Sequence, residues 1–533
     1  MDGFYRVGAA VPELRLGDVD HNIQKIQTLY EQAAAKGCAA VVFPELCVTG
    51  YTCADLFEQE FLISRGREAL LHFCAQTRGC ATVAILGLAL PYQNGLYNCA
   101  AIIQDGKVLG LVPKSHIPNY REFYEKRWFL PGRQIRNSTY RLGTEDIPWG
   151  VDLLFYGDDR FTFGVELCED LWTPVPPSVY QACAGAALCF NLSASDELVT
   201  KADYRRDLLR MHSARCFGGY VYASAGPGES STDLVYGGHA LIAENGLILA
   251  ENQRFVFASS LITADVDVHR LWHLRRAEST LREASTPYPF RHVQLPMPPP
   301  ALQTLERAVD PHPFVPDNPQ LRNERCREIF DIQASALARR VAHCHARKLV
   351  IGVSGGLDST LALLVCERAI KVLNRATADI MAVTMPGFGT TDQTYRNAVE
   401  LAKALQTDFR EMPIRESAKL QLQALQHDPN QHDVTYENVQ ARERTMLLMN
   451  LANKHGGLVV GTGDLSELAL GWCTYNADHM SMYAVNASIP KTLVRYIISW
   501  VREQRPELQE VLDRILSTPI SPELLPPDAN GDI

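Results

Sequence analysis

A glycine-rich segment has the residues needed to bind phosphate groups: Ser354-Gly355-Gly356-Leu357-Asp358-Ser359-Thr360. It follows an apolar run, residues 349–353, that predicts a buried strand, and residues 361–364 after it favour a helix. Glycine lets backbone N–H groups approach phosphate oxygens, and the N-terminus of the following helix favours negative charge. The hydroxyls of Ser354 and Ser359 add hydrogen-bond donors. The segment therefore predicts ATP chemistry, and the alternative is a glycine-rich turn before an ordinary helix.

This loop lacks the lysine of the common G-x-x-x-x-G-K-[ST] phosphate loop. It offers instead the carboxylate of Asp358, which is better suited to holding Mg²⁺ on a pyrophosphate leaving group. The pattern S-G-G-x-D-S resembles the loop of the ATP pyrophosphatases, enzymes that form an adenylate and release pyrophosphate.

Three segments in the N-terminal half suggest a second chemistry. Glu45, Lys114 and Cys168 each close a short apolar run, so all three would project from strand ends into one pocket. A thiolate can attack an amide carbonyl, a carboxylate can take the thiol proton and pass one to the leaving ammonia, and an ammonium can stabilise the oxyanion. We also expect the lysine to lower the pKa of the thiol.

Taken singly, these residues have simpler explanations, because a cysteine is often a small core residue and Glu45 or Lys114 a solvated loop charge. Together, and in this order, they resemble the nitrilase (carbon–nitrogen hydrolase) superfamily over residues 4–270. The resemblance implies a second pocket glutamate at Glu125, eleven residues after Lys114. A surface charge is the alternative for Glu125.

A nitrilase-like amidase joined to an ATP pyrophosphatase loop resembles the glutamine-dependent NAD synthetase family. Two further segments support this resemblance: residues 438–444 match N-x-Q-A-R-x-R, and residues 461–467 match G-T-x-x-x-S-E. The family implies that deamido-NAD, ATP and glutamine become NAD, AMP, pyrophosphate and glutamate. ATP is then a substrate, Mg²⁺ a cofactor, and the protein a homo-oligomer.

The resemblance also implies the binding residues. Those for glutamine are Tyr51, Tyr120, Glu125, Glu169, Ser195 and Lys201. Those for ATP are Gly352, Ser354, Gly355, Gly356, Asp358, Ser359 and Thr462. Those for deamido-NAD are Asn438, Glu467, Trp472, Tyr475 and Lys491, with Asp358 and Glu467 sharing the metal. The alternatives are an exposed helix face for Asn438 and core filling for Trp472.

Composition limits the remaining choices. The 533 residues, 46% hydrophobic and 21% charged, suffice for two large α/β domains. A net charge of −10 argues against a nucleic-acid or anionic-membrane partner and favours small molecules. Three features of the sequence predict a cytoplasmic enzyme. The fourteen cysteines form no zinc-type pairs, Met1-Asp2-Gly3 shows no signal-peptide pattern, and no apolar run is long enough to span a bilayer.

The predicted architecture is α/β throughout. It comprises a nitrilase-like α-β-β-α sandwich over residues 1–275 and a doubly wound parallel-sheet ATP pyrophosphatase domain, adenine nucleotide alpha hydrolase-like, over residues 326–533. Ten prolines between 287 and 319 predict an extended linker over 276–325. Local patterns predict a helix over 20–36, a strand over 39–43 that leads to Glu45, and a helix from about 323 to 347.

The C-terminal residues 522–533 are acidic and rich in proline, and members of the family usually continue further. We therefore expect either a truncated sequence or a synthetase site that is incomplete or is completed by a neighbouring subunit. This leaves two other possibilities. One is an amidase whose second domain only binds nucleotide, and the other is a non-catalytic ATP-sensing or scaffolding subunit.

Overall fold

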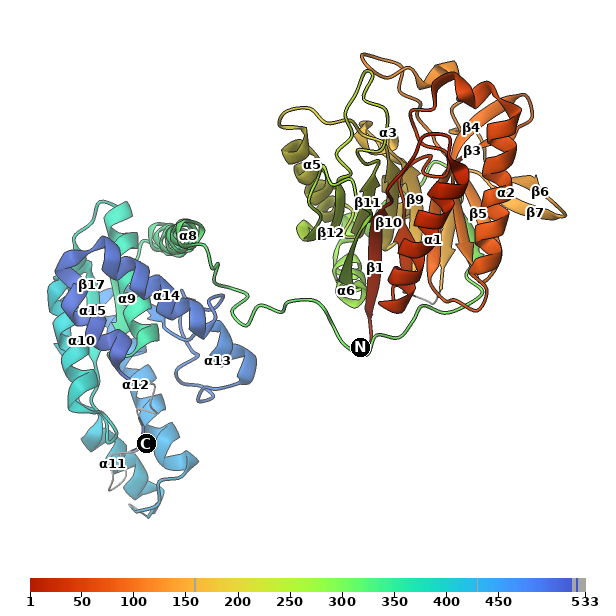
Figure 1. The fold of residues 1–533 in the computed structure, drawn as a ribbon. Helices are drawn as coiled ribbons and strands as arrows, with labels where there is room; N and C mark the ends of the chain where they lie inside the picture. Colours follow the sequence, from red (N-terminus) through yellow and green to blue (C-terminus); the bar gives the residue numbers. More distant parts are fainter. Residues whose placement is uncertain (158–159, 429, 520–523, 526–533) are drawn as a thin grey trace. The chain divides into compact units, whose positions relative to one another are not determined.

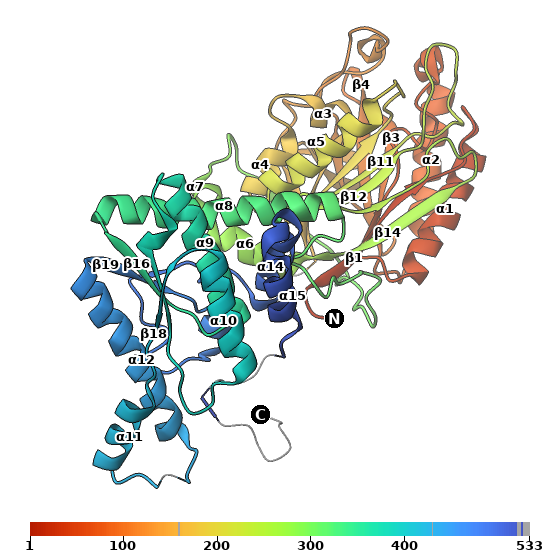
Figure 2. The ribbon, with the colours of Figure 1, turned by 90° about the vertical axis from the view of Figure 1, so that its left-hand side faces the viewer.

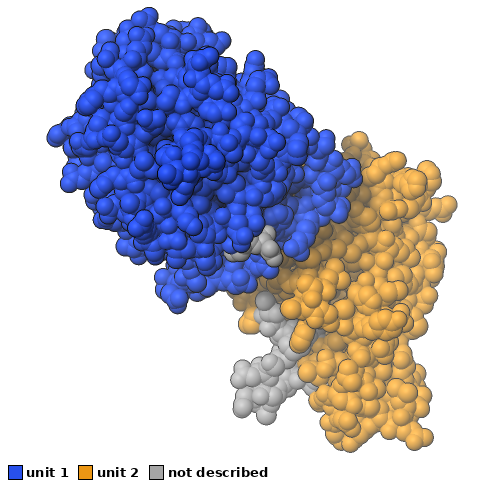
Figure 3. All heavy atoms as spheres, turned by 90° about the vertical axis from the view of Figure 1, so that its right-hand side faces the viewer, with its two compact units in different colours: residues 1–308 blue, residues 309–533 orange. Residues whose placement is uncertain are grey.

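The computed structural model describes residues 1–157, 160–428, 430–519 and 524–525. The chain divides into two compact units, Met1–Ala308 and Val309–Ile533 (Figure 3). Within the described residues, no helix combines the length and the apolar character needed to cross a membrane.

The first unit contains two mixed β-sheets, each with both parallel and antiparallel pairings. The eight-stranded sheet has the order β14 (Ser260–Asp267), β1 (Phe4–Val11), β2 (Ala40–Val42), β3 (Val83–Tyr92), β4 (Gly95–Gln104), β5 (Lys107–Pro113), β7 (Glu145–Trp149), β6 (Ser138–Leu142). The seven-stranded sheet has the order β13 (Leu247–Glu251), β12 (Ala240–Glu244), β11 (Gly219–Ser224), β10 (Leu188–Ser193), β9 (Thr162–Leu167), β8 (Leu153–Tyr156), β15 (Arg291–Gln294).

The two sheets face each other across an apolar core and carry helices on their outer faces (Figure 1). Helices α1 (Val19–Ala35) and α2 (Glu60–Gln76) cover the first sheet, whereas α4 (Pro177–Cys183) and α5 (Lys201–Arg215) cover the second. Short helices connect these layers: η1 (Ala54–Glu58), η2 (Glu125–Arg127), α3 (Glu169–Trp172), α6 (Val268–Ala277) and α7 (Ser279–Glu283). The predicted α-β-β-α sandwich is therefore confirmed.

The second unit has one five-stranded sheet in which every pairing is parallel. Its order is β18 (Asp408–Glu411), β17 (Ile380–Thr384), β16 (Lys348–Gly352), β19 (Gly457–Gly461), β20 (Tyr483–Ala484). Because both faces are covered, the strands are apolar on both sides: Leu349 and Ile351 face one core, and Val350 faces the other.

Helices on both faces make this unit the predicted doubly wound fold. One face carries α8 (Pro319–Cys344), α9 (Leu357–Val372), α10 (Asp392–Ala404), α14 (Lys491–Gln504) and α15 (Gln509–Ser517). The other face carries α12 (Val434–His455), and Figure 2 shows α11 (Arg415–Ala424) beside α12. The short elements η3 (Thr377–Asp379), α13 (Leu465–Leu470) and η4 (Pro506–Leu508) complete the unit.

The proline-rich segment is more regular than an extended linker. It contains α7 and β15, and β15 pairs with β8 at a sheet edge, where proline-flanked strands are tolerated because one side needs no partner. Helix α8 begins at Pro319, earlier than predicted, because Asn318 caps it and proline fits the first helical turn. Apart from residues 524–525, the prediction for residues 522–533 lies outside the described residues.

Candidate active sites

Three strand ends of the first unit deliver the predicted catalytic side chains. Glu45 follows β2, Lys114 follows β5 and Cys168 follows β9. The ammonium Nζ of Lys114 lies 2.5 Å from Glu45 Oε1, and both side chains are completely buried. Asn98, on β4, donates a hydrogen bond to the same oxygen. The structure therefore brings a carboxylate and an ammonium together where neither side chain is exposed to solvent.

Glu125 belongs to this cluster and is not a surface charge. The side chain of Glu125 is 3% exposed, and Lys114 Nζ donates to its two carboxylate oxygens at 2.8 and 2.9 Å. The phenol of Tyr51 donates to Glu125 Oε1 at 2.7 Å. One ammonium therefore compensates two buried carboxylates, an arrangement that fixes its position.

The ionisation of the cluster follows from this burial. Burial raises the pKa of Glu45 to about 7, although Lys114 pulls it down. Burial opposes the charge on Lys114, but Glu125 and Glu45 outweigh it and raise the lysine pKa well above its usual value. Glu45 is thus poised to accept a proton near neutral pH, whereas Lys114 stays charged.

The thiol of Cys168 differs from the sequence prediction. Lys114 does act to lower its pKa, but burial and the negative charge of Glu45 are stronger, so the pKa of Cys168 is raised. The prediction of a lowered pKa is wrong because it counted the lysine alone. Cys168 is therefore a protonated thiol that needs a base, and its backbone φ of 42° places it on a sharp turn between β9 and α3.

The predicted glutamine-binding residues surround this cluster. Tyr51 is joined to the cluster by its hydrogen bond to Glu125, and the Tyr120 phenol donates to both oxygens of Glu169 at 3.0 Å. Burial and the charge of Glu169 raise the pKa of Tyr120. Tyr120 itself is 48% exposed.

Ser195 and Lys201 are held by residues that the sequence analysis missed. The guanidinium of the buried Arg205 donates to Ser195 Oγ at 3.2 Å, and Asp196 pairs with the Lys201 ammonium. The Lys201 ammonium also lies 5.6 Å from the centre of the Trp172 ring. No motif marks Arg205, which lies within an ordinary helical pattern on α5.

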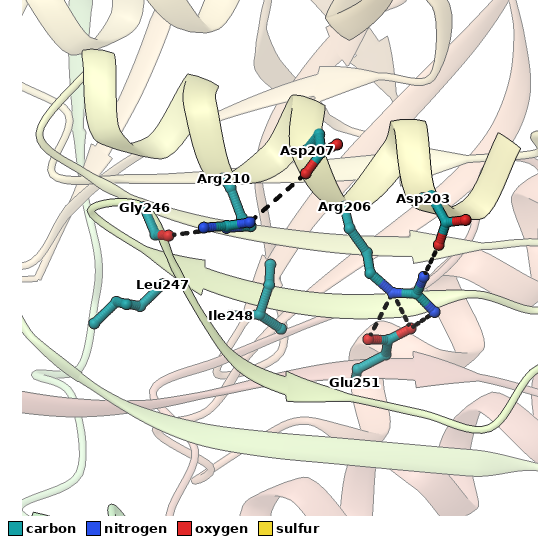
Figure 4. Close-up of a pocket in the computed structure, with 8 residues that line it drawn as sticks. All are labelled: Asp203, Arg206, Asp207, Arg210, Gly246, Leu247, Ile248 and Glu251. Atoms are coloured by element: carbon teal, nitrogen blue, oxygen red, sulfur yellow. Dashed lines mark hydrogen bonds and ion pairs between the residues drawn. The ribbon is translucent and has the colours of Figure 1, made fainter. Parts of the chain in front are cut away.

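A separate cavity of about 390 Å³ lies between α5 and the β12–β13 hairpin (Figure 4). Its lining residues are Asp203, Arg206, Asp207, Arg210, Gly246, Leu247, Ile248 and Glu251. Its charged groups pair with one another, since Arg206 binds Asp203 and Glu251, and Arg210 lies near Asp207. None of the predicted site residues lines it.

The phosphate-binding loop of the second unit follows β16, as predicted. Gly355 has φ +87°, and a Cβ there would lie 2.0 Å from the Thr394 carbonyl oxygen, so this position requires glycine. Ser354 Oγ lies 3.2 Å from Ser359 Oγ, and Gly356 precedes the first residue of α9. The loop therefore ends with backbone N–H groups at a helix N-terminus, where an anion is favoured.

A carboxylate cluster lies beside this loop. One oxygen each from Asp358, Asp464 and Glu467 lies within 4.8 Å of the others. The Lys491 ammonium is 2.6 Å from Asp358 and 3.2 Å from both Asp464 and Glu467. Burial raises the pKa of Asp358 to about 6, with Lys491 acting in the opposite direction. The predicted metal pair and Lys491 therefore meet at one place.

Sequence reasoning missed Asp464 and Asn486 in this cluster. Asp464 and Glu467 form the capping box of α13. This structural role alone accounts for an acidic residue at position 464, so the sequence gives no sign of a chemical role. Asn486 donates to the carbonyl oxygens of Asp358 and Thr462 at 3.0 Å and so joins the phosphate loop to the end of β19.

The residues predicted to bind deamido-NAD lie on α12 and in the segment after α13. Asn438 lies on α12 and is partly buried. Trp472 is 77% exposed and Tyr475 is 81% exposed, so core filling does not explain Trp472. Arg442, also on α12, donates to the Tyr475 carbonyl oxygen at 3.4 Å, which places this segment beside α12.

Comparison with known proteins assigns a class to each unit. Residues 6–276 match the carbon–nitrogen hydrolase family, and residues 329–526 match the NAD synthase family. The chain is thus a carbon–nitrogen hydrolase domain fused to an NAD synthase domain.

Whole-chain relatives identify the family. The chain is 43% identical to the glutamine-dependent NAD(+) synthetase of Mycobacterium leprae, over 99% of this chain and 80% of that protein. It is 30% identical to the corresponding protein of Thermotoga maritima, over 98% of this chain and 84% of that protein. A solved glutamine-dependent NAD(+) synthetase from Cytophaga hutchinsonii aligns with 97% of this chain and 84% of its own, at 23% identity and a TM-score of 0.45. The chain belongs to the glutamine-dependent NAD(+) synthetase family.

Proposed function

We propose that the first unit releases ammonia from glutamine and that the second unit uses it to convert ATP-activated deamido-NAD to NAD, with AMP, pyrophosphate and glutamate as the other products. The observation that carries this proposal is the buried Glu45–Lys114–Glu125 cluster beside Cys168. Family membership supports both halves of the reaction.

In the glutaminase half, the Cys168 sulfur attacks the side-chain carbonyl carbon of glutamine while Glu45 takes the thiol proton. Lys114 stabilises the negative oxygen of the tetrahedral intermediate. Glu45 returns the proton to the amide nitrogen, the C–N bond breaks, and ammonia leaves a thioester on Cys168. Water then hydrolyses the thioester to glutamate, and Cys168 regains its proton. The pKa of about 7 suits Glu45 to both directions of transfer.

In the synthetase half, the loop from Gly352 to Ser359 binds the ATP phosphates. The donor set beside it fits Mg²⁺, since it consists of carboxylate oxygens and includes the buried Asp358 Oδ1, which has no hydrogen-bond partner among the described residues. Asp358 and Glu467 would hold the ion, which would offset charge on the departing pyrophosphate. Lys491 supplies a second positive charge at the same place.

Binding of deamido-NAD completes the proposed site. Asn438, Trp472 and Tyr475 would contact the dinucleotide, and the exposed rings offer faces for stacking on its pyridine ring. Thr462, at the end of β19, would touch the nucleotide of ATP. Assembly into a homo-oligomer and a cytoplasmic location stay predictions.

One assay tests the proposal. The protein is incubated with deamido-NAD, ATP and Mg²⁺, with either glutamine or ammonia, and NAD, AMP and glutamate are measured separately. We expect all three products with glutamine, and NAD and AMP with ammonia. Glutamate without NAD would instead indicate an amidase whose second unit only binds nucleotide. ATP binding without any product would indicate a scaffold.

A further inference from the structure

The carboxylate of Asp170 connects the two segments that carry the catalytic lysine and cysteine. Its Oδ1 accepts from the His116 backbone N–H at 2.8 Å and lies 2.9 Å from His116 Nδ1. Its Oδ2 accepts from the backbone N–H groups of Ser115 and Leu167, each at 3.2 Å. Asp170 is 1% exposed, so these partners replace water completely.

The partners of Asp170 lie next to the reacting groups in sequence. Leu167 directly precedes Cys168, and Ser115 directly follows Lys114. The hydrogen bond to Asp170 also raises the pKa of the His116 imidazole, even though burial opposes this. One buried side chain therefore ties the end of β9 to the end of β5.

The cysteine segment needs such support. Cys168 has φ 42° and ψ −99°, a conformation that is unfavourable for a residue with a side chain and persists only when its surroundings impose it. The Cys168 backbone N–H donates to the Leu192 carbonyl oxygen at 2.8 Å, which fixes one side of the turn. Asp170 fixes the residue before the turn and links it to the lysine segment.

We propose that Asp170 is a positioning residue that sets the Cys168 thiol and the Lys114 ammonium at the separation needed for attack and oxyanion stabilisation. It touches neither group and acts through the backbone of Leu167, Ser115 and His116. The inference rests on the proposed glutaminase function. Small displacements of reacting groups matter, since a 1 Å misplacement can cost about 10²-fold in rate.

A matched control exists in the same unit. Asp152 is 2% exposed and accepts from the Asn137 backbone N–H and the Arg291 guanidinium at 2.8 to 2.9 Å. It is therefore another buried carboxylate with several hydrogen bonds, but none of its partners adjoins a catalytic residue. His116→Gln is a second control, because it removes the imidazole and keeps the three backbone bonds.

The test compares Asp170→Asn, Asp152→Asn and His116→Gln in the full chain. We expect Asp170→Asn to lower kcat for glutamine hydrolysis by about 10- to 100-fold with less than about a threefold change in KM, and to leave ammonia-driven NAD formation within about twofold. Both controls should keep kcat within about threefold, with thermal stability measured for all three. An unchanged kcat in Asp170→Asn, or an equal loss in Asp152→Asn, would overturn the proposal.

A second readout does not need glutamine turnover. Alkylation of Cys168 by iodoacetamide, followed against pH, reports the surroundings of the thiol. We expect the profile to shift in Asp170→Asn and not in Asp152→Asn, and an unshifted profile contradicts the inference. Failure of the proposed function would appear differently, as a wild-type protein that forms no glutamate.

Should Asp170→Asn not fold, Asp170→Glu serves in its place. It keeps the charge but moves the carboxylate by one methylene, so it cannot hold all four donors where they lie. We expect a loss of kcat of about tenfold, with ammonia-driven activity retained. Wild-type kcat in folded Asp170→Glu would overturn the proposal.

Discussion

Each unit places one lysine among carboxylates, but the two lysines differ in their access to water. Lys114 and its partner Glu45 are completely buried, whereas the side chains of Lys491, Asp358 and Glu467 are 29%, 22% and 28% exposed. The buried cluster of Glu45, Lys114 and Glu125 holds its charged groups in fixed positions, which suits repeated proton transfer at one atom. The partly exposed cluster of Lys491, Asp358 and Glu467 can exchange its partners, which suits a site where phosphates and a metal ion bind and dissociate. The difference in burial thus matches the difference in proposed chemistry.

The largest expected effect separates the two sites completely. We expect Cys168→Ala to abolish glutamine hydrolysis and to leave ammonia-driven NAD formation intact, because the nucleophile belongs to the buried site alone. Cys189→Ala is the matched control, since Cys189 is also buried, in β10 beside β9, but hydrogen-bonds toward Gln181, outside the cluster. Loss of both activities in a folded Cys168→Ala protein would show that the thiol is structural.

The second prediction concerns the partly exposed carboxylates Asp358 and Glu467 of the second unit. We expect Asp358→Asn or Glu467→Gln to remove AMP and pyrophosphate formation with either nitrogen source, and to leave basal glutaminase activity measurable. Any residual turnover should need more Mg²⁺, because a carboxylate ligand has been lost. Asp379→Asn, which removes a partly exposed acid paired with Arg375, should have little effect. Normal adenylate formation at ordinary Mg²⁺ would exclude the altered residue as a ligand.

A third prediction uses the ionisation of Glu45 in the buried cluster. Glu45 must be ionised to accept the thiol proton, so kcat/KM for glutamine should rise with pH through about 7, the pKa of Glu45. Glu125 contributes to raising that pKa, so Glu125→Gln should move the acid limb of the pH profile to lower pH. A limb that stays in place would mean that another group limits the rate. The measurement is the pH dependence of kcat/KM in both proteins.

The smallest expected effect concerns the exposed aromatic side chains. We expect Trp472→Ala to raise the KM for deamido-NAD by about 3- to 10-fold, because an aromatic pair is worth about 0.5–1.5 kcal/mol. Leu470→Ala is the control, since Leu470 is 80% exposed in the same segment. Equal effects of the two changes, measured by steady-state kinetics, would assign the contribution to general apolar contact and not to stacking.

Sequence reasoning located the strand ends because their signals are local. Apolar runs that stop at Pro44 and Pro113 predict that Glu45 and Lys114 follow strands, and the structure agrees. The phosphate loop was equally clear, because two consecutive glycines follow an apolar run, and Gly355 has φ +87° in the structure. Alternating strand and helix patterns predicted the α/β class, and the family resemblance implied the two particular folds.

The remaining features depend on contacts distant in sequence. Asn98 lies within an apolar strand and meets Glu45 only through sheet pairing. Asp464 looks like an ordinary helix cap, and the exposure of Trp472 depends on what packs around its segment. The raised pKa of the Cys168 thiol reflects burial by several segments together, which no single motif reveals.

The central claim is that the two lysine–carboxylate clusters carry out separate reactions, and a paired substitution tests it most directly. Lys114→Met and Lys491→Met are each assayed with glutamine and with ammonia, and glutamate, AMP and NAD are measured. We predict that Lys114→Met lowers kcat for glutamine hydrolysis by about 10²-fold and leaves ammonia-driven NAD formation unchanged. Lys491→Met should instead stop AMP and NAD formation and retain basal glutamate release. A Lys114→Met protein that changes only the KM for glutamine, or either variant losing both activities while folded, would contradict the account.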